Sequence, residues 1–290
     1  MYKYLLCWRY LRTRYIALAS IVSVMLGVAT MIVVNSVMAG FSSKMRDRLH
    51  GVLADVVVES RSLDGFDSPE AVMDLVRKVA GNEIEAMAPT CEMYALLTFY
   101  VGEQPYTRQV QLIGVQPEQR AKTGDFAEFL QDEGGHRLPP SFEITDELKL
   151  RNPRGALLGQ LDPDDPSAKD IRAEMEERMP QYGAIIGAAI ASIRRPGADH
   201  DTFVVPRGSR VILTFPTGGK EPQPAHDAFL VTGFFKSGMS EYDSSHVYVP
   251  LERLQYLRKL GDGKGHGKVN QIQIRAKAGV PLDTLALRLQ

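Results

Sequence analysis

The stretch that decides the fold runs from Tyr15 to Ser43 and reads YIALASIVSVMLGVATMIVVNSVMAGFSS. It contains no Asp, Glu, Lys, Arg, His or Pro. A bilayer core of about 30 Å needs roughly 20 apolar residues in a helix that rises about 1.5 Å per residue. The stretch therefore predicts a transmembrane helix over residues 15–43, with some length left for tilt.

Two other interpretations of this stretch are a core helix of a soluble protein and a cleaved signal peptide. A core helix is usually shorter and carries a polar face. A signal peptide has a shorter apolar region and ends in an A-x-A pattern, whereas Ala39 and Gly40 are followed by Phe41. The sequence fits a retained membrane helix better than either alternative.

Positive charges flank the stretch on both sides, with a small excess before it that favours a cytoplasmic amino terminus. These residues are Lys3, Arg9, Arg12 and Arg14 before the stretch, and Lys44, Arg46 and Arg48 after it. Residues 1–14 are then a cytoplasmic segment and everything after the span lies outside the cytoplasm. Met45, Leu49 and Leu53 continue the helical spacing, so residues 44–54 are expected to extend the helix into water.

The rest of the 290-residue chain has the composition of a folded, water-soluble domain, with 44% hydrophobic and 24% charged residues overall. The net charge of −1 gives no basic footprint for nucleic acid. Cys7 and Cys91 fall on opposite sides of the expected membrane, so they are not expected to form a disulfide. We interpret Cys91 as a small buried residue.

Apolar runs and turn residues after the span predict a β-α-β-β unit followed by a polar region and a second apolar group. After the polar region, Ala184–Ile193 is expected to be a short apolar, alanine-rich helix. A final helix starts near Pro281 and the chain stops inside it, from which we expect the 290 residues to be part of a larger functional unit. The other expected elements are a strand at 56–58, a helix at 71–79, strands at 95–101 and 107–115, an exposed helix at 168–178, strands at 210–215, 228–235 and 246–249, a helix at 251–260 and a strand at 269–275.

Four motifs contain residue types that carry chemistry in other proteins, and none matches a catalytic or metal-binding pattern. The glycine-rich run Gly261–Val269 lacks the Gly and the Ser or Thr that a phosphate loop requires. The acidic loop Asp162–Asp165 is broken by prolines, and His200 has no partner at metal-ligand spacing. Asp243, Ser244 and His246 lie close in sequence without a nucleophile elbow. We therefore expect no enzymatic activity, no cofactor and no metal in this chain.

Small residues recur every four positions within the expected span, a pattern typical of helices that pack closely in membranes. Asn35 adds a polar side chain that can hydrogen-bond to a neighbouring helix. The alternative is that Ala, Ser and Gly are simply common in membrane helices, and the sequence does not decide between the two. The candidate helix-packing face consists of Ala19, Ser23, Gly27, Ser36 and Gly40.

Several segments together resemble bacterial ABC-transporter permeases of the FtsX/MacB type, most closely the lipoprotein-releasing LolC/LolE subunits. The segments are Trp8–Arg14, the exit Ser36–Phe41, Leu112–Pro117, Ala184–Ala191, where the family has a helix start, and, most specifically, Phe235–Leu251. The resemblance covers nearly the whole chain. It implies a membrane-anchored α+β fold, with one transmembrane helix followed by a periplasmic porter-like subdomain over 55–115 and 228–290, and an inserted subdomain over 116–227.

The resemblance also implies a function. The chain would be a permease subunit in the bacterial inner membrane that couples ATP hydrolysis by a separate cytoplasmic ABC ATPase to the movement or release of lipoproteins or another amphiphile. A second permease copy or homologue and membrane lipid would be further partners. Met38 and Phe41 match family positions that hold acyl chains at the outer mouth of the helix bundle, and Met45 is a further candidate contact.

Two departures from the family pattern and two alternatives accompany this hypothesis. The family continues through three more membrane helices, and the segment Phe215–Pro224 looks shorter than the hook that recruits a periplasmic chaperone. The chain could instead be a non-transport subunit that transmits ATPase motion to a periplasmic partner, or a lone membrane-tethered binding module. An ATPase partner would support the first two hypotheses and exclude the third.

Overall fold

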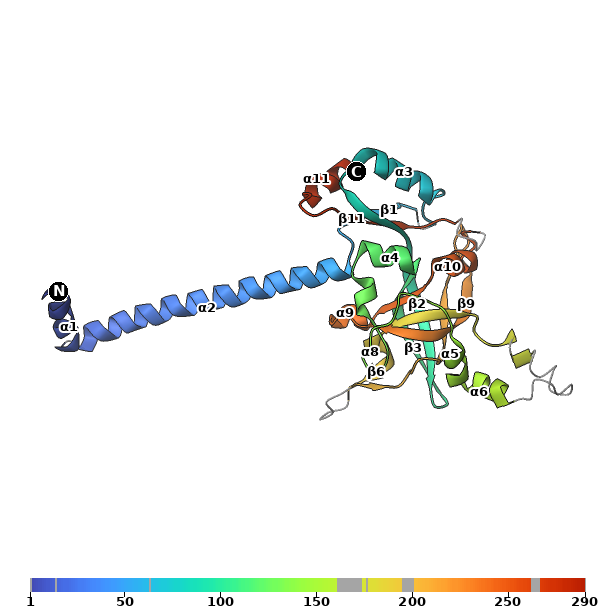
Figure 1. Cartoon of the computed structure of the whole chain (residues 1–290), viewed down its shortest axis with the longest axis horizontal. Coiled ribbons are helices and arrows are strands. Elements are labelled where there is room, and N and C mark those ends of the chain that lie inside the picture. The colour runs from blue at the N-terminus through green and yellow to red at the C-terminus, as the bar shows by residue number, and fades with distance from the viewer. Residues whose placement is uncertain are drawn as a thin grey trace. The chain divides into compact units, whose positions relative to one another are not determined.

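The computed structural model describes residues 2–13, 15–62, 64–160, 174–175, 177–194, 201–261 and 267–289. The chain divides into two compact units, Met1–His50 and Gly51–Gln290. The first unit consists of the helix α1, Tyr2–Thr13, and most of the long helix α2, Tyr15–Val52 (Figure 1). As expected, α2 continues unbroken beyond the apolar stretch and ends near Gly51.

The segment Leu18–Met45 within α2 is long and apolar enough to cross a membrane, with a mean hydropathy of 2.2 over 28 residues. None of its most apolar window is buried inside the protein. The core-helix interpretation is therefore wrong, because such a helix would lie within a hydrophobic core.

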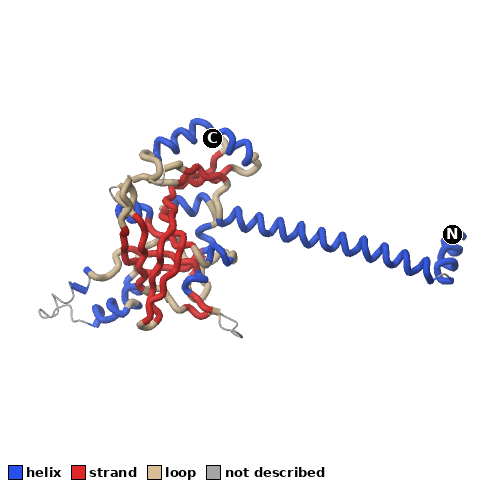
Figure 2. The backbone as a smooth tube through the Cα atoms, turned by 180° about the vertical axis from the view of Figure 1, so that it is seen from behind, coloured by secondary structure: helices blue, strands red, loops and turns tan. Residues whose placement is uncertain are grey.

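The second unit is a mixed α+β domain built on one large sheet, whose strands cross the domain in Figure 2. Within the described residues the strand order is β1-β11-β2-β3-β10-β5-β9-β4, and β8 pairs with both β2 and β9. The strands are β1 Val56–Glu59, β2 Ile84–Val101, β3 Gln104–Val115, β4 Leu130–Gln131, β5 Tyr182–Gly187, β8 Arg210–Pro216, β9 Pro224–Phe235, β10 His246–Pro250 and β11 Gln271–Ala276. A separate small sheet pairs β6, Ser192–Ile193, with β7, Thr202–Phe203.

Helices α3 and α11 lie side by side near the end of the sheet that holds β1 and β11 (Figure 1). Ser68-Pro69-Glu70 predicts the start of α3, and Pro69 does occupy its first turn. Among the described residues, the helices of the domain are α3 Pro69–Ala80, α4 Pro117–Thr123, the 3₁₀ helix η1 Phe126–Phe129, α5 Asp146–Arg151, α6 Pro153–Gln160, α8 Ala188–Ala191, α9 Ser240–Asp243, α10 Leu251–Leu257 and α11 Leu282–Leu289.

The predicted β-α-β-β unit is present as β1, α3, β2 and β3. β2 and β3 form the expected hairpin, with Val101 opposite Gln104 and Gly102 at φ +64° in the turn. β2 begins at Ile84, earlier than expected, because its first half pairs with β11 and its second half with β3 and β8. The pairing with β11, which is distant in sequence, leaves no local sequence pattern that marks the start of β2.

The expected helix over Ala184–Ile193 is wrong for all but Ala188–Ala191. The segment is strand β5, then the four-residue α8, then β6. β5 lies between β10 and β9, and its side chains alternate between two cores: Ala184 and Ile186 face one, Ile185 the other. A strand covered on both faces reads as a continuous apolar run, which resembles a buried helix.

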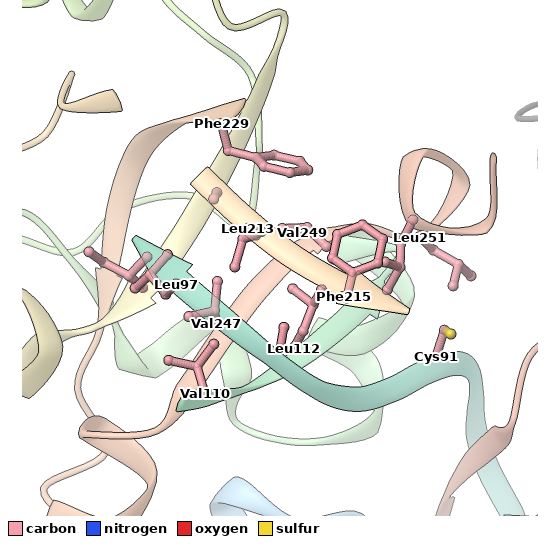
Figure 3. Close-up of a cluster of buried hydrophobic side chains, with 14 of the residues drawn as sticks. Cys91, Leu97, Val110, Leu112, Leu213, Phe215, Phe229, Val247, Val249 and Leu251 are labelled. Carbon is pink, nitrogen blue, oxygen red and sulfur yellow. The ribbon is translucent and has the colours of Figure 1, made fainter. Parts of the chain in front are cut away.

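Strands β2, β3, β8, β9 and β10 contribute side chains to the larger core, together with β5, β11 and helices α3, α10 and α11, and Figure 3 shows Leu97, Val110, Leu213, Phe229 and Val247 within it. Cys91 lies at its edge, is fully buried, and accepts a hydrogen bond from Arg258 at 3.3 Å. Burial raises the pKa of the Cys91 thiol. The expectation of a buried structural cysteine is confirmed.

The stretch 116–227 contributes β4, β5 and β8 to the same sheet as the strands of the flanking stretches. The boundaries of an inserted subdomain at 116 and 227 stay a prediction. The acidic loop Asp162–Asp165, His200 and most of the expected helix over 168–178 lie outside the described residues, as do residues 262–266 of the glycine-rich run.

Candidate functional site: the apolar helix and a buried polar cluster

The first candidate site is the surface of α2 itself. Its large apolar side chains are exposed throughout the segment Leu18–Met45, including Met38 and Phe41 at 63% each. A contiguous apolar surface of this length is stable only against lipid or other apolar helices. α2 therefore presents a surface that requires a membrane or neighbouring helices.

The unbroken helix places the predicted site residues on two faces. At about 100° per residue, Met38, Phe41 and Met45 stand within about 40° of Gly27, on the same side of the helix as Ser23. Ser36 and Gly40 point to the other side, since Ser36 is turned by about 180° from Gly27. The single small-residue face expected from sequence thus divides: Ser23 and Gly27 share a face with the candidate acyl-chain contacts, and Ala19, turned by about 80° from Gly27, lies at the margin of that face.

The polar side chains of α2 fall into two groups. Ser20 donates to Ile16 O at 3.0 Å and Thr30 donates to Leu26 O at 2.8 Å, so their hydroxyls are satisfied within the helix. Ser23, Asn35 and Ser36 make no side-chain hydrogen bond to any described residue. A polar group in lipid is stabilised by a partner on another helix. Asn35 lies about 80° from Gly27, at the margin of that face.

Gly27 and Gly40 have no packing partner within the described chain, because a Cβ added at either position would meet nothing within 4 Å. Glycine inside a helix is less favourable than alanine by about 1 kcal/mol. In membrane helices that difference is offset when a neighbouring helix approaches closely. These two positions therefore favour helix contacts outside this chain segment.

The second candidate site is a polar cluster inside the domain, formed by Glu92, Gln111, Arg120, His246 and Tyr248. The Gln111 amide donates to Glu92, and its Oε1 lies 3.1 Å from His246 Nε2. His246 Nδ1 lies 3.2 Å from the Tyr248 hydroxyl. The neutral imidazole with its proton on Nε2 satisfies both neighbours.

Burial sets the protonation states in this polar cluster. It lowers the pKa of His246 to about 4, and the nearby Arg120 guanidinium lowers it further. Burial also raises the pKa of Glu92, and raises that of the fully buried Tyr248. Glu92, Gln111, His246 and Tyr248 are linked to one another by hydrogen bonds, so this part of the polar cluster connects strands β2, β3 and β10.

The Asp243 carboxylate has a structural partner set as well. It accepts hydrogen bonds from Ser237 N at 2.7 Å, Ser237 Oγ at 2.8 Å and Gly238 N at 3.1 Å. This cap closes the turn that precedes α9. Asp243, Ser244 and His246 do not form a hydrolase triad, because the carboxylate and the imidazole bond to different groups.

Two further motifs are placed by the structure. The segment Phe215–Pro224 is a hairpin connection between β8 and β9. Two hydrogen bonds hold it: Gly218 N donates to Arg258 O at 2.8 Å, and Gly219 N donates to Asp64 Oδ1 at 2.9 Å. Within the described part of the chain, no group of three or more His, Cys, Asp or Glu side chains is arranged to hold a metal ion.

Sequence reasoning missed Arg120. Its side chain is 4% exposed, and its guanidinium donates to Val52 O at 2.8 Å and also to Gln273. The sequence Pro117–Thr123 reads as a polar, solvated segment. Only the fold brings the end of α2 and strand β11 to this side chain.

A long apolar helix that continues into a mixed α+β domain defines a class of membrane-anchored proteins with one large domain outside the bilayer. Residues 17–290 match the model of the MacB-like periplasmic core domain, and the chain belongs to this family. The matched range includes both α2 and the whole domain. The domain is thus the periplasmic domain of a MacB/FtsX-type ABC transporter permease.

Two solved structures are similar to this chain at 14% sequence identity each. The extracellular domain of the noncanonic ABC-type transporter YknZ from Gram-positive bacteria has a TM-score of 0.36, with 79% of this chain and 88% of that chain covered. The periplasmic region of MacB from Actinobacillus actinomycetemcomitans has a TM-score of 0.35, with 80% and 78% covered. No curated protein sequence matches the chain.

Proposed function

We propose that this chain is a transmembrane permease subunit in the bacterial inner membrane, working in an ABC transporter that moves or releases lipoproteins or another amphiphile. ATP is hydrolysed by a separate cytoplasmic ABC ATPase subunit in this proposal. A second permease copy or a homologue completes the helix bundle. The lipoprotein-releasing LolC/LolE subunits are the proposed functional counterparts.

The observation that carries the proposal is the extent of the family match, which includes the membrane helix together with the domain. A lone tethered binding module would need α2 only as an anchor. Gly27, Gly40 and the unpaired Asn35 amide favour close helix neighbours instead, as a bundle of permease helices supplies them. The face shared by Gly27 and Met45 is the proposed packing and cargo face.

The cargo class is proposed from the chemistry of the outer part of α2. Met38, Phe41 and Met45 share one face of the helix, and their side chains are 63%, 63% and 45% exposed. Methionine adapts its shape to irregular apolar ligands, which suits flexible acyl chains. Charged residues begin at Lys44, so this face lies near the expected periplasmic surface of the inner membrane. An acyl chain would leave the bilayer there.

Release of a fluorescent triacylated lipoprotein from proteoliposomes that hold the chain with its ATPase partner tests this proposal. Met38→Asp places a charge on the cargo face, and we expect at least about a ten-fold loss of ATP-dependent release, because burying an unpaired carboxylate against acyl chains costs more than about 1.4 kcal/mol. Met38→Leu keeps the surface apolar and is expected to retain release.

Ala39→Asp is the matched control, since it adds the same charge at the same depth but is turned by about 100° from Met38. Equal expression and membrane insertion of all three variants is checked first. Wild-type release by Met38→Asp would refute the assignment of the cargo face. Equal loss in Met38→Asp and Ala39→Asp would mean that any charge at this depth disturbs the helix.

A further inference from the structure

The carboxyl-terminal end of α2 is capped by a distant segment of the chain. The last carbonyl groups of a helix have no partner within the helix and need donors from elsewhere. Gly51 O accepts a hydrogen bond from Asp125 N at 2.9 Å, and Val52 O accepts one from Arg120 at 2.8 Å. Both residues and both donors belong to the domain unit. Residues 120–125 thus replace the local cap that most helices use.

The fit between the two segments is too close for larger side chains. A Cβ at Gly51 would lie 2.8 Å from Asp125 Oδ2 and 3.2 Å from Phe129 Cζ. A Cβ at Gly124 would lie 3.3 Å from Gly51 O. Val52 is 3% exposed and packs in the smaller core with Phe126. The contact is a packed joint, with apolar contacts surrounding the two hydrogen bonds.

Arg120 connects this joint to the sheet. Its guanidinium donates to Val52 O and to the Gln273 side chain, and β11, which carries Gln273, pairs with β1 and β2. Arg120 Nη1 also lies 3.4 Å from Thr123 Oγ1. Nε has no hydrogen-bond partner among the described residues. One side chain therefore bonds to the helix end and to a sheet strand.

Burying a guanidinium carries a large desolvation penalty. Burial lowers the pKa of Arg120, which reflects the loss of hydration of its charge. Apolar residues of similar volume often replace buried charges without loss of stability. A positive charge is stabilised at the carboxyl end of a helix, because that end of the helix dipole is negative. The position of Arg120 thus serves the helix end better than it serves the core.

We propose that Arg120, together with the segment Pro117–Phe129, is a clamp that fixes the terminal residues of α2 to strand β11, so that force on the helix reaches the sheet through Arg120 and Gln273. The role of the clamp in transmitting force rests on the proposed function, in which a permease passes the motion of its ATPase along α2. Arg120 is a positioning residue: it holds Val52 and touches no cargo.

Hydrogen–deuterium exchange of the full chain in lipid nanodiscs tests the clamp without cargo or ATPase. Arg120→Met keeps the apolar stem and removes the guanidinium. We expect amides of residues 49–55 to exchange at least about ten times faster. The end of α2 frays more readily once it has lost the hydrogen bond from the charged guanidinium. Strands β9 and β10 are expected to keep their protection.

Arg258→Met is the matched control, because Arg258 is also buried, at 5% exposure, and bonds to Cys91. Loss of a buried guanidinium there is expected to leave residues 49–55 unchanged. Unchanged exchange in Arg120→Met, or a loss spread evenly over the domain in both variants, would overturn the clamp. If Arg120→Met does not fold, Arg120→Lys takes its place, with a smaller rise expected at the same residues.

Gln273→Leu separates the clamp from the helix cap. It removes the link to β11 and leaves the bond from Arg120 to Val52, so residues 49–55 are expected to stay protected. In proteoliposomes with the ATPase partner, we expect Gln273→Leu to hydrolyse ATP at the wild-type rate but to release several-fold less cargo per ATP. Equal release per ATP would overturn the proposed force path. No release by the wild type, with the exchange result intact, would refute the proposed function and leave the clamp standing.

Discussion

At the scale of single residues, Asp243 is the side chain whose role in the domain is most sharply defined. Its carboxylate accepts three hydrogen bonds from Ser237 and Gly238, and it is 6% exposed. Asp243→Asn turns one acceptor oxygen into a donor that faces other donors. We expect a loss of about 1.5–3 kcal/mol in the free energy of unfolding, the range for hydrogen bonds to charged groups.

Urea unfolding of the full chain in detergent, followed by circular dichroism, measures this loss. The exposed Asp283→Asn is the matched control and is expected to change stability by less than about 0.5 kcal/mol. If Asp243→Asn is as stable as the wild type, the three hydrogen bonds do not hold the turn.

His246 gives the domain a predictable response to pH. Its pKa is about 4 in the folded protein and about 6.5 when unfolded, so the unfolded chain binds more protons between these values. The free energy of unfolding is expected to fall as the pH is lowered from 7 to 4, by about 2–3 kcal/mol from this group. The raised pKa of Glu92 acts in the opposite direction.

Melting temperatures at pH 7.5 and pH 5 check this prediction. His246→Gln should reduce the difference between the two temperatures, whereas the exposed His226→Gln should keep the wild-type difference. An unchanged pH dependence in His246→Gln would show that the imidazole is not held neutral by burial.

Residues with long-range partners were the ones that sequence did not predict. Cys91 was placed in the core correctly because a buried cysteine is a common outcome for a short apolar side chain. Arg120 gave no signal, since its partners Val52 and Gln273 lie 68 and 153 positions away. A hydrogen bond between distant segments depends on the fold and leaves no periodicity in the sequence.

At the scale of elements, the long helix and the hairpin were predictable and β5 was not. α2 has a strong signal because an uncharged apolar run of this length has few other structures open to it. β5 is a buried strand with alanine and isoleucine on one face and isoleucine on the other, and its apolar run does not differ from that of a buried helix. The angle between the faces that carry Gly27 and Ser36 depends on α2 being one continuous helix, which the structure provides.

The small-residue face of α2 predicts a defect in assembly. Gly27→Leu adds bulk where a neighbouring helix is proposed to approach, and we expect a several-fold lower yield of co-purified permease and ATPase subunits. Val28→Leu lies at the same depth on another side and is expected to leave the yield unchanged. Yields are compared at equal membrane expression, and an equal yield for Gly27→Leu and the wild type would remove Gly27 from the packing face.

At the scale of the whole molecule, the family match joins the apolar helix and the periplasmic domain into one functional part of a permease. The domain holds its own hydrophobic cores, its polar cluster links strands β2, β3 and β10, and Asp243 holds the turn before α9. The chemistry of transport is therefore proposed to lie in the ATPase partner, while this chain supplies the helix surface and the link from helix to sheet.

Purification of the tagged full chain from its native membranes in mild detergent tests this central claim most directly, with MgATP hydrolysis measured on the eluate. We expect a subunit with a nucleotide-binding domain to co-purify and the complex to hydrolyse MgATP. Recovery of the intact, folded chain alone, without hydrolysis in several detergents and in nanodiscs, would contradict it and favour a membrane-tethered binding module.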